Sequence, residues 1–213
     1  MELKIIEPPK VINNNPNKKI KFVDGQVYEY EIYKLSDKYS DSLRQKLNLF
    51  DFNNPPIPPR YLAVSLIETM ALHNGVGLSA NQCGLPYRVF VMGAQKVGFA
   101  CFNPEIIEAT GEETFEEGCL SWPGMFIPVK RAASIKVRYQ DMNGKFQEES
   151  FSGLTARIFL HEYDHMEGIF YTSKVSPIIL ERQKKKVKGN LKKLGEQRRA
   201  TEKARKEAAE KKS

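Results

Sequence analysis

Two histidines four residues apart place the strongest constraint on how this chain can fold. His161 and His165 lie in a segment, residues 154–167, whose pattern predicts a helix. Residues four apart share one helix face, so both imidazoles can bind one metal ion beside the carboxylate of Glu162. The chain has only three histidines, and the apolar run at residues 158–160 predicts partial burial, which favours metal ligands over two solvated histidines. The segment therefore predicts a metal-binding helix.

A catalytic metal needs a further protein ligand, because such sites usually have three protein ligands and a water molecule. No histidine follows His165, which excludes the downstream third histidine of some metalloproteases, and Glu167 lies too close along the helix. Cys119, in the segment EGCLS at residues 117–121, offers a thiol that would bind as the thiolate. The alternative for Cys119 is a small buried apolar residue, the usual role of a free cysteine.

A third segment, GVGLSANQ at residues 75–82, combines glycines with a side-chain amide. Gly75 and Gly77 allow another backbone to approach closely, and Gln82 can donate a hydrogen bond to an oxyanion. The segment follows a predicted helix and not a strand, so it is not a dinucleotide-binding fingerprint.

Taken in order, the segments 75–82, 117–121 and 161–165 resemble the three signature motifs of the peptide deformylases. The resemblance covers residues 56–170. It implies a hydrolase that removes the N-formyl group from the N-terminal formyl-methionine of newly made polypeptides and releases formate. It also implies one divalent metal ion, Fe²⁺, for which Ni²⁺, Co²⁺ or Zn²⁺ can substitute.

The resemblance implies a role for each residue that carries it. Glu162 would be the catalytic carboxylate, which takes a proton from the attacking water and later delivers it to the departing amine. The metal ion would lower the pKa of that water. The implied metal ligands are Cys119, His161 and His165, and the implied oxyanion donors are Gln82 and the backbone N–H of Leu120.

The substrate peptide is expected to pair as an added strand with the extended segment Gly75–Leu78, of which Gly75, Val76 and Gly77 are predicted to bind it. The resemblance further implies that four apolar residues line the pocket for the methionine side chain. For each of them the alternative is ordinary packing in the core. These four residues are Val76, Leu120, Leu154 and Ile158.

The chain departs from the family pattern at several positions. Ser79 replaces an alanine of many relatives, Trp122 is bulky where small aliphatic residues are frequent, and Phe126 stands where many relatives carry arginine. These changes bear on peptide preference and not on the chemistry. Asp164, beside the motif histidines, is expected either to pair with Arg131 or to be solvated on the helix surface.

The pattern around the motifs predicts an α+β fold of short, mostly antiparallel strands packed around the metal-binding helix. A helix at residues 60–73, ended by Asn74-Gly75, precedes strands at 87–92, 99–102 and 134–140. Asn143-Gly144 predicts a hairpin to a strand at 145–151. Without regular βαβ alternation, a parallel sheet is not expected. Residues 1–180 are expected to form the catalytic domain, although the segment before Pro55 fits the family poorly and has no assignment.

The positive charge of the chain is concentrated at one end. Residues 181–213 hold 14 Lys and Arg against 5 Glu, a net charge of +9, whereas the preceding residues carry −2 of the total of +7. The stretch 196–210 is rich in helix formers but has no apolar stripe, which predicts a solvated helix or a disordered tail. Such a tail is either a solubilising extension or an electrostatic contact with the ribosome or RNA, made through phosphates because it has no aromatic residue.

The composition predicts one globular domain with an appendage in a reducing compartment, and we expect a cytoplasmic monomer. The chain has 213 residues, of which 41% are hydrophobic, and no apolar run approaches the roughly 18–20 residues that span a bilayer. Three cysteines without framework spacing argue against a disulfide scaffold. The N-terminus has neither a signal-peptide nor a transit-peptide pattern.

Three other functions fit parts of the pattern. Another metallohydrolase would need a different third ligand, and a ribosome- or RNA-binding protein with an inactive metal site would rest on the tail alone. A thiol enzyme would use Cys119 and His161 and would survive metal removal. The presence of all three candidate ligands together with Glu162 favours the deformylase.

Overall fold

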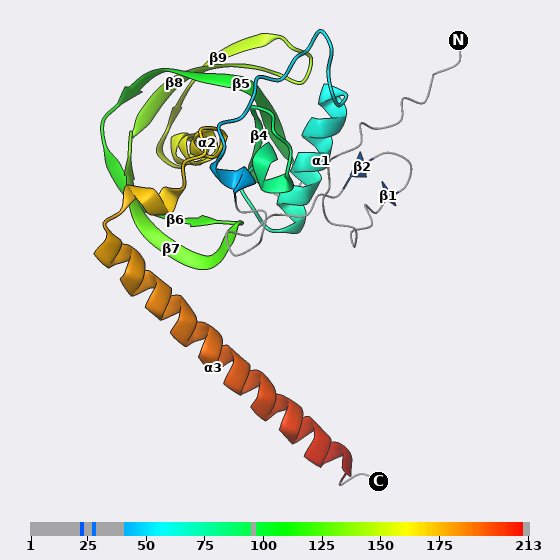
Figure 1. The fold of residues 1–213 in the computed structure, drawn as a ribbon, viewed down its shortest axis with the longest axis vertical. Helices are drawn as coiled ribbons and strands as arrows, with labels where there is room; N and C mark the ends of the chain where they lie inside the picture. Colours follow the sequence, from blue (N-terminus) through cyan, green and yellow to red (C-terminus); the bar gives the residue numbers. More distant parts are fainter. Residues whose placement is uncertain (1–21, 24–26, 29–40, 95–96, 211–213) are drawn as a thin grey trace.

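Helix α2 (Gly153–Met166), which carries both histidines of the motif, lies at the centre of the structure with strands around it (Figure 1). The structure is a computed structural model that describes residues 22–23, 27–28, 41–94 and 97–210. Most of the unassigned segment before Pro55 therefore lies outside the described residues. The combination of antiparallel sheets with helices confirms the predicted α+β fold.

A five-stranded antiparallel sheet with the order β3-β4-β5-β8-β9 forms the main layer. Strands β6 and β7 form a separate antiparallel pair, and so do the two-residue strands β1 and β2. The strands are β1 Phe22–Val23, β2 Val27–Tyr28, β3 Gly77–Ser79, β4 Val89–Ala94, β5 Val97–Thr110, β6 Glu113–Cys119, β7 Trp122–Arg131, β8 Ser134–Gln140 and β9 Phe146–Ser152.

Strand prediction succeeds where strands are half-buried and fails where they are exposed. Strand β8 has its predicted bounds, and the turn that leads to β9 contains Gly144 at φ +78°. Strand β5 reaches Thr110, well beyond the predicted 99–102, because most of its second half is exposed and lacks an apolar run. Strands β6 and β7 are not predicted as a pair, since the first four residues of β6 are all exposed and show no alternation.

Helix α1 (Pro59–Leu72) begins at a proline. Proline suits the first turn of a helix because the backbone N–H groups of that turn have no acceptor within the helix, so the missing N–H of proline costs no hydrogen bond. Leu62 and Leu66 are fully buried, as the helical spacing predicts, whereas Leu72 is exposed. Asn74 adopts the left-handed conformation at φ +55°. The asparagine, and not the glycine after it, therefore makes the turn that ends the helix.

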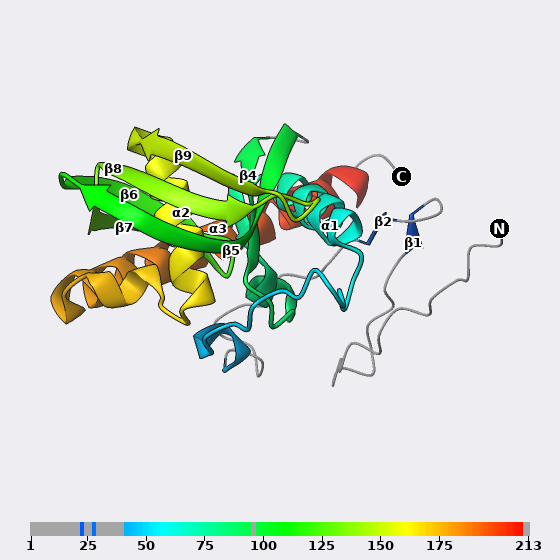
Figure 2. The same ribbon diagram turned by 90° about the horizontal axis from the view of Figure 1, so that it is seen from above.

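Helices α1 and α2 lie on opposite sides of strand β4 (Figures 1 and 2). Phe159 of α2 is fully buried in a cluster with Phe90 and Val137 of the main sheet, and its ring meets that of Phe90 edge-on at a centroid distance of 5.0 Å. Packing of this side fixes the rotation of α2. The motif residues consequently face β3 and the end of β6.

Helix α3 (Pro177–Glu210) projects from the rest of the structure as a single long helix (Figure 1). Its beginning is docked, because Leu180 and Val187 pack against a buried cluster. This cluster consists of Met125, Ile127 and Val129 of β7 and of Tyr171, which follows α2 in the short helix η3 (Tyr171–Lys174). The basic segment is therefore helical as far as Glu210. None of the helices in the described ranges is long and apolar enough to cross a lipid bilayer.

Candidate active site

The fold brings together the three candidate metal ligands. Cys119 ends strand β6, and His161 and His165 lie on consecutive turns of α2. One ligand atom from each of the three lies within 4.8 Å of the others, and the Sγ of Cys119 is 3.3 Å from the Nε2 of His165. This spacing is compatible with a single ion bound between one sulfur and two nitrogen ligands.

Glu117 orients the first histidine. Its Oε2 is 3.0 Å from the Nδ1 of His161, while Arg131 donates to both carboxylate oxygens at 2.6 and 2.9 Å. Burial opposes ionisation of Glu117, but the hydrogen bonds from His161 and Arg131 and the charge of Arg131 prevail and lower its pKa to about 2. The ionised carboxylate accepts the Nδ1 proton of His161 and thereby leaves the Nε2 lone pair for a metal.

Two arginines complete this buried ionic cluster. Arg131 also donates to Asp164 at 2.5 Å, which confirms the predicted pairing of these residues. Arg157 donates to Glu117 at 2.8 Å and to the backbone oxygen of Val129 at 2.7 Å. The cluster ties the end of β6 to α2 and so sets the distance between the thiol and the imidazoles.

The sequence analysis did not predict that Glu117 and Arg157 help to position the candidate metal ligands, although the residue spacing indicates both. Glu117 and Cys119 are two apart, which places them on one face of a strand. Arg157, His161 and His165 follow one another at intervals of four, the spacing of one helix face.

His165 is almost completely buried. Burial, with smaller contributions from the charges of His161 and Arg131, moves its pKa well below the ordinary histidine value, so the imidazole is neutral and can act as a ligand. Asn81 donates from its side-chain amide to the backbone oxygen of His165 at 2.8 Å and holds this turn of the helix in place.

Glu162 lies in a buried position directly beside β3. Burial raises its pKa to about 8; the charge of Arg131 opposes this shift, and that of Glu117 adds to it. Among the described residues, its Oε2 has no hydrogen-bond partner. A Cβ atom added at Gly77 would lie 2.9 Å from the Cγ and Cδ of Glu162, so this carboxyl group reaches its position only because residue 77 is glycine.

Gln82 lies in the short helix η2 (Ala80–Cys83) with its amide oriented by its neighbours. The Oε1 accepts a hydrogen bond from the N–H of Ser79 at 2.9 Å, which turns the Nε2 toward Ser121 at 3.2 Å and the Sγ of Cys119 at 3.6 Å. The hydroxyl of Ser79 in turn donates to the backbone oxygen of Glu162 at 3.1 Å. The serine that departs from the family pattern thus joins η2 to α2.

One cavity of about 490 Å³ connects these groups. Every predicted site residue except His165, which lies behind the others, lines it. Leu154 is 68% exposed at the cavity mouth, which excludes its alternative role as a core residue, and Val76 is also exposed. The predicted lining residues are Gly75, Val76, Gly77, Gln82, Cys119, Leu120, Leu154, Ile158, His161 and Glu162.

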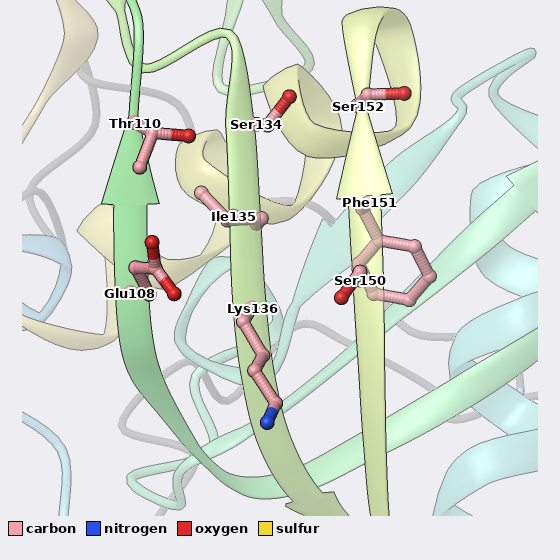
Figure 3. Close-up of a pocket in the computed structure, with 8 residues that line it drawn as sticks. All are labelled: Glu108, Thr110, Ser134, Ile135, Lys136, Ser150, Phe151 and Ser152. Carbon is pink, nitrogen blue, oxygen red and sulfur yellow. The ribbon is translucent and has the colours of Figure 1, made fainter.

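A second cavity, of about 220 Å³, lies between strands β5, β8 and β9 (Figure 3). Hydroxyl groups such as those of Thr110 and Ser134, the charged Glu108 and Lys136, and the ring of Phe151 surround it. It contains none of the predicted site residues and none of the three candidate metal ligands.

The family model described as polypeptide deformylase matches residues 30–180. The chain belongs to the peptide deformylase family. A peptide deformylase of Thermotoga neapolitana is 46% identical over 113 residues, which cover 53% of this chain and 69% of the relative.

Solved peptide deformylase structures share the fold. The enzyme from Thermotoga maritima matches with a TM-score of 0.62 at 38% identity, over 70% of this chain and 99% of its own. The enzyme from Legionella pneumophila matches with a TM-score of 0.67 at 33% identity, over 78% and 97% of the two chains. Like other peptide deformylases, this chain is a metal-dependent hydrolase that removes the N-formyl group of newly made polypeptides, which excludes the thiol-enzyme and binding-only interpretations.

Proposed function

We propose that this peptide deformylase hydrolyses N-formylmethionyl peptides with Fe²⁺ held by Cys119, His161 and His165, and that Glu162 transfers the protons. The observation that carries the proposal is the convergence of a thiol, two imidazoles and a buried carboxyl group at one cavity. Each group comes with neighbours that fix its orientation.

The donor set fits a divalent transition metal. One thiolate and two imidazoles combine soft and intermediate ligands, a set that suits Fe²⁺ as well as Zn²⁺, Co²⁺ and Ni²⁺. The hydrogen bond to Glu117 directs the Nε2 of His161 toward the site, and the neutral His165 offers its own lone pair. Three protein ligands leave a position for water or substrate, as catalysis requires. We propose Fe²⁺ as the resident ion, with the other three as functional substitutes.

Glu162 is the proposed general base and acid. A divalent ion held by the three ligands would lower the pKa of water and polarise the formyl oxygen. The positive charge of such an ion would hold the Glu162 carboxyl group ionised against the effect of burial. The carboxylate accepts a proton as the water oxygen bonds to the formyl carbon, and it gives that proton to the nitrogen as the C–N bond breaks. Formate and a free amino terminus result. The unpartnered Oε2 of Glu162, directed into a buried site, supports this role.

Gln82 and the backbone N–H of Leu120 are the proposed donors to the developing oxyanion. The amide of Gln82 is held with its Nε2 near Cys119, and Leu120 follows Cys119 at the cavity wall. Donors fixed before the reaction stabilise the transition state without reorganising, and the loss of one typically costs about 10²–10³ in rate.

The substrate backbone is proposed to bind along Gly75, Val76 and Gly77. Strand β3 is the end strand of the main sheet, and the segment that leads into it lines the cavity. An extended peptide can therefore add to this edge through main-chain hydrogen bonds, with little dependence on side chains. The methionine side chain would be surrounded by the four apolar residues Val76, Leu120, Leu154 and Ile158.

The division into a catalytic domain at residues 1–180 and a basic extension at residues 181–213 is also proposed, with the extension contacting the ribosome or RNA. Its net charge of +9 supports an interaction with phosphates.

A chain that stops after Gly189 keeps Leu180 and Val187, which dock the helix, but loses nine of the 14 basic residues. We expect this chain to retain its activity on short peptides and to co-sediment less with ribosomes, most clearly at raised salt. Unchanged co-sedimentation would refute the contact.

The proposed setting is the cytoplasm, with the enzyme acting as a monomer on N-formylmethionyl nascent peptides. Cys83 and Cys101 are buried free thiols, which is compatible with a reducing compartment. Sedimentation equilibrium would determine the oligomeric state without depending on molecular shape.

Formate release from formyl-methionyl tripeptides is the direct test of the proposed chemistry. Protein loaded with Fe²⁺ without oxygen, or with Ni²⁺, should turn over, and Glu162→Ala should lose activity while retaining bound metal. Cys119→Ser should lose both activity and metal. Turnover by Glu162→Ala at the wild-type rate would exclude Glu162 as the proton carrier.

A further inference from the structure

Three exposed apolar side chains surround the mouth of the cavity. Val76 is 48% exposed, Phe126 is 57% exposed and Leu154 is 68% exposed, and each lines the cavity. They come from three separate elements: the segment before β3, strand β7 and the first turn of α2. Exposed apolar surface that is continuous with a substrate cavity is typical of a binding surface that a ligand covers.

Phe126 is the largest of these side chains, and its ring has a fixed support. A Cβ atom added at Gly118 would lie 2.7 Å from the Cε1 and 3.0 Å from the Cδ1 of Phe126. The ring therefore packs directly on the backbone of Gly118, the residue before the proposed ligand Cys119. This contact keeps an aromatic surface close to the part of the cavity where the proposed metal ligand Cys119 lies.

The charges at the cavity wall complement this apolar surface. Arg157 is the only lysine or arginine among the described residues that line the cavity. It is 4% exposed and donates to Glu117 and to the backbone oxygens of Glu113 and Val129. The same wall carries the exposed carboxylate of Glu116. A negatively charged ligand would thus meet apolar side chains and a like charge, without a lysine or arginine available from this wall.

We propose that Phe126, whose ring extends the exposed apolar surface of Val76 and Leu154 beyond the methionine pocket, selects peptides whose two residues after the methionine are apolar and discriminates against acidic ones. The inference rests on the proposed function. An apolar side chain would cover the ring of Phe126 and remove apolar surface from water. An acidic side chain would lose part of its hydration beside that ring and would be repelled by Glu116.

The test compares kcat/KM for three formyl-methionyl tripeptides, in which both following residues are leucine, serine or aspartate. We expect the wild-type enzyme to favour leucine over aspartate about 10-fold or more, in the range of a single apolar contact. Phe126→Leu should keep this preference, Phe126→Gln should weaken it, and Phe126→Arg should abolish or reverse it. Phe146→Arg changes an equally exposed phenylalanine on β9, outside the cavity, and should leave the ratio unchanged.

Each outcome has a defined meaning because the measured quantity is a ratio between peptides. Equal kcat/KM for leucine and aspartate peptides in the wild-type enzyme would overturn the proposal, and so would a preference that Phe126→Arg and Phe126→Gln leave intact. The absence of turnover with all three peptides by metal-loaded wild-type enzyme would refute the proposed function instead. Thermal unfolding of each variant identifies any that has failed to fold, and the leucine and glutamine variants then carry the comparison.

Discussion

Glu117 holds three residues around the site in place with a single side chain. Its carboxylate accepts hydrogen bonds from His161, Arg131 and Arg157. Removing one charged partner from a buried ionic cluster leaves the remaining charges unpaired, and this lowers the free energy of unfolding by about 3–5 kcal/mol. We expect Glu117→Gln to lower the free energy of unfolding by about this amount in urea at pH 7. Its exposed neighbour offers a matched control, since Glu116→Gln should change stability by less than about 0.5 kcal/mol.

The same carboxylate should make stability depend on pH. Against the opposing effect of burial, its hydrogen bonds lower its pKa from the ordinary value of 4.5 to about 2, so the folded state binds its proton less readily than the unfolded state. The stabilisation is therefore complete above about pH 4.5 and is lost as the pH falls toward 2. The stability difference between metal-free wild type and Glu117→Gln should shrink over this range. A difference that stays constant from pH 6 to pH 3 would contradict the assignment.

Gly77 is expected to be as important for activity as the side chains around it. A methyl group there would compete with Glu162 for space and displace its carboxyl group. Displacement of a reacting group by about 1 Å can reduce the rate by about 10²-fold. We expect Gly77→Ala to lower kcat/KM by about this factor while metal content, measured by elemental analysis, stays unchanged. Gly189→Ala, in open space on α3, should have no effect on activity.

At the scale of elements, burial determines what the sequence alone could predict. Helices α1 and α2 and strand β8 each bury one face, so their apolar spacing is visible in the sequence. The largely exposed β6 shows no such spacing, and its pairing with β7 depends on contacts distant in sequence. The candidate site was predictable from three short motifs. The contact between Glu117 and His161, which are 44 residues apart, becomes evident only when β6 and α2 are packed together.

Helix α3 combines a docked beginning with an exposed remainder, and the two parts should contribute differently to stability. Leu180 and Val187 pack against β7, whereas most of the described side chains after Gly189 are exposed. A chain ending after Gly189 should unfold thermally at nearly the wild-type temperature. Leu180→Ala combined with Val187→Ala should lower the unfolding temperature by several degrees, as the loss of about 1–2 kcal/mol predicts. An unfolding temperature of the double variant equal to that of the wild type would show that the docking contributes nothing.

At the scale of the whole molecule, the proposed metal site adds a second link between the β6–β7 pair and α2, which the buried ionic cluster around Glu117 already joins. Cys119 belongs to the two-stranded sheet of β6 and β7, whereas His161 and His165 belong to helix α2, which packs on the main sheet. A metal that binds only the folded state should stabilise it by about 2.7 kcal/mol when present at 100 times its dissociation constant. We expect Ni²⁺ or Zn²⁺ to raise the unfolding temperature and a chelator to reverse the rise. His161→Ala should abolish this response.

The long projecting helix has a consequence for how large this protein looks in solution. A helix of 34 residues, the length of α3, is about 50 Å long, whereas a folded body of about 135 residues, roughly the described residues between 41 and 176, has a radius of gyration of only about 14 Å. Much of α3 extends into solvent, so the molecule experiences more friction than a sphere of the same mass. On a gel-filtration column calibrated with compact proteins, a monomer of 24.4 kDa should therefore elute early, at the position of a considerably heavier particle.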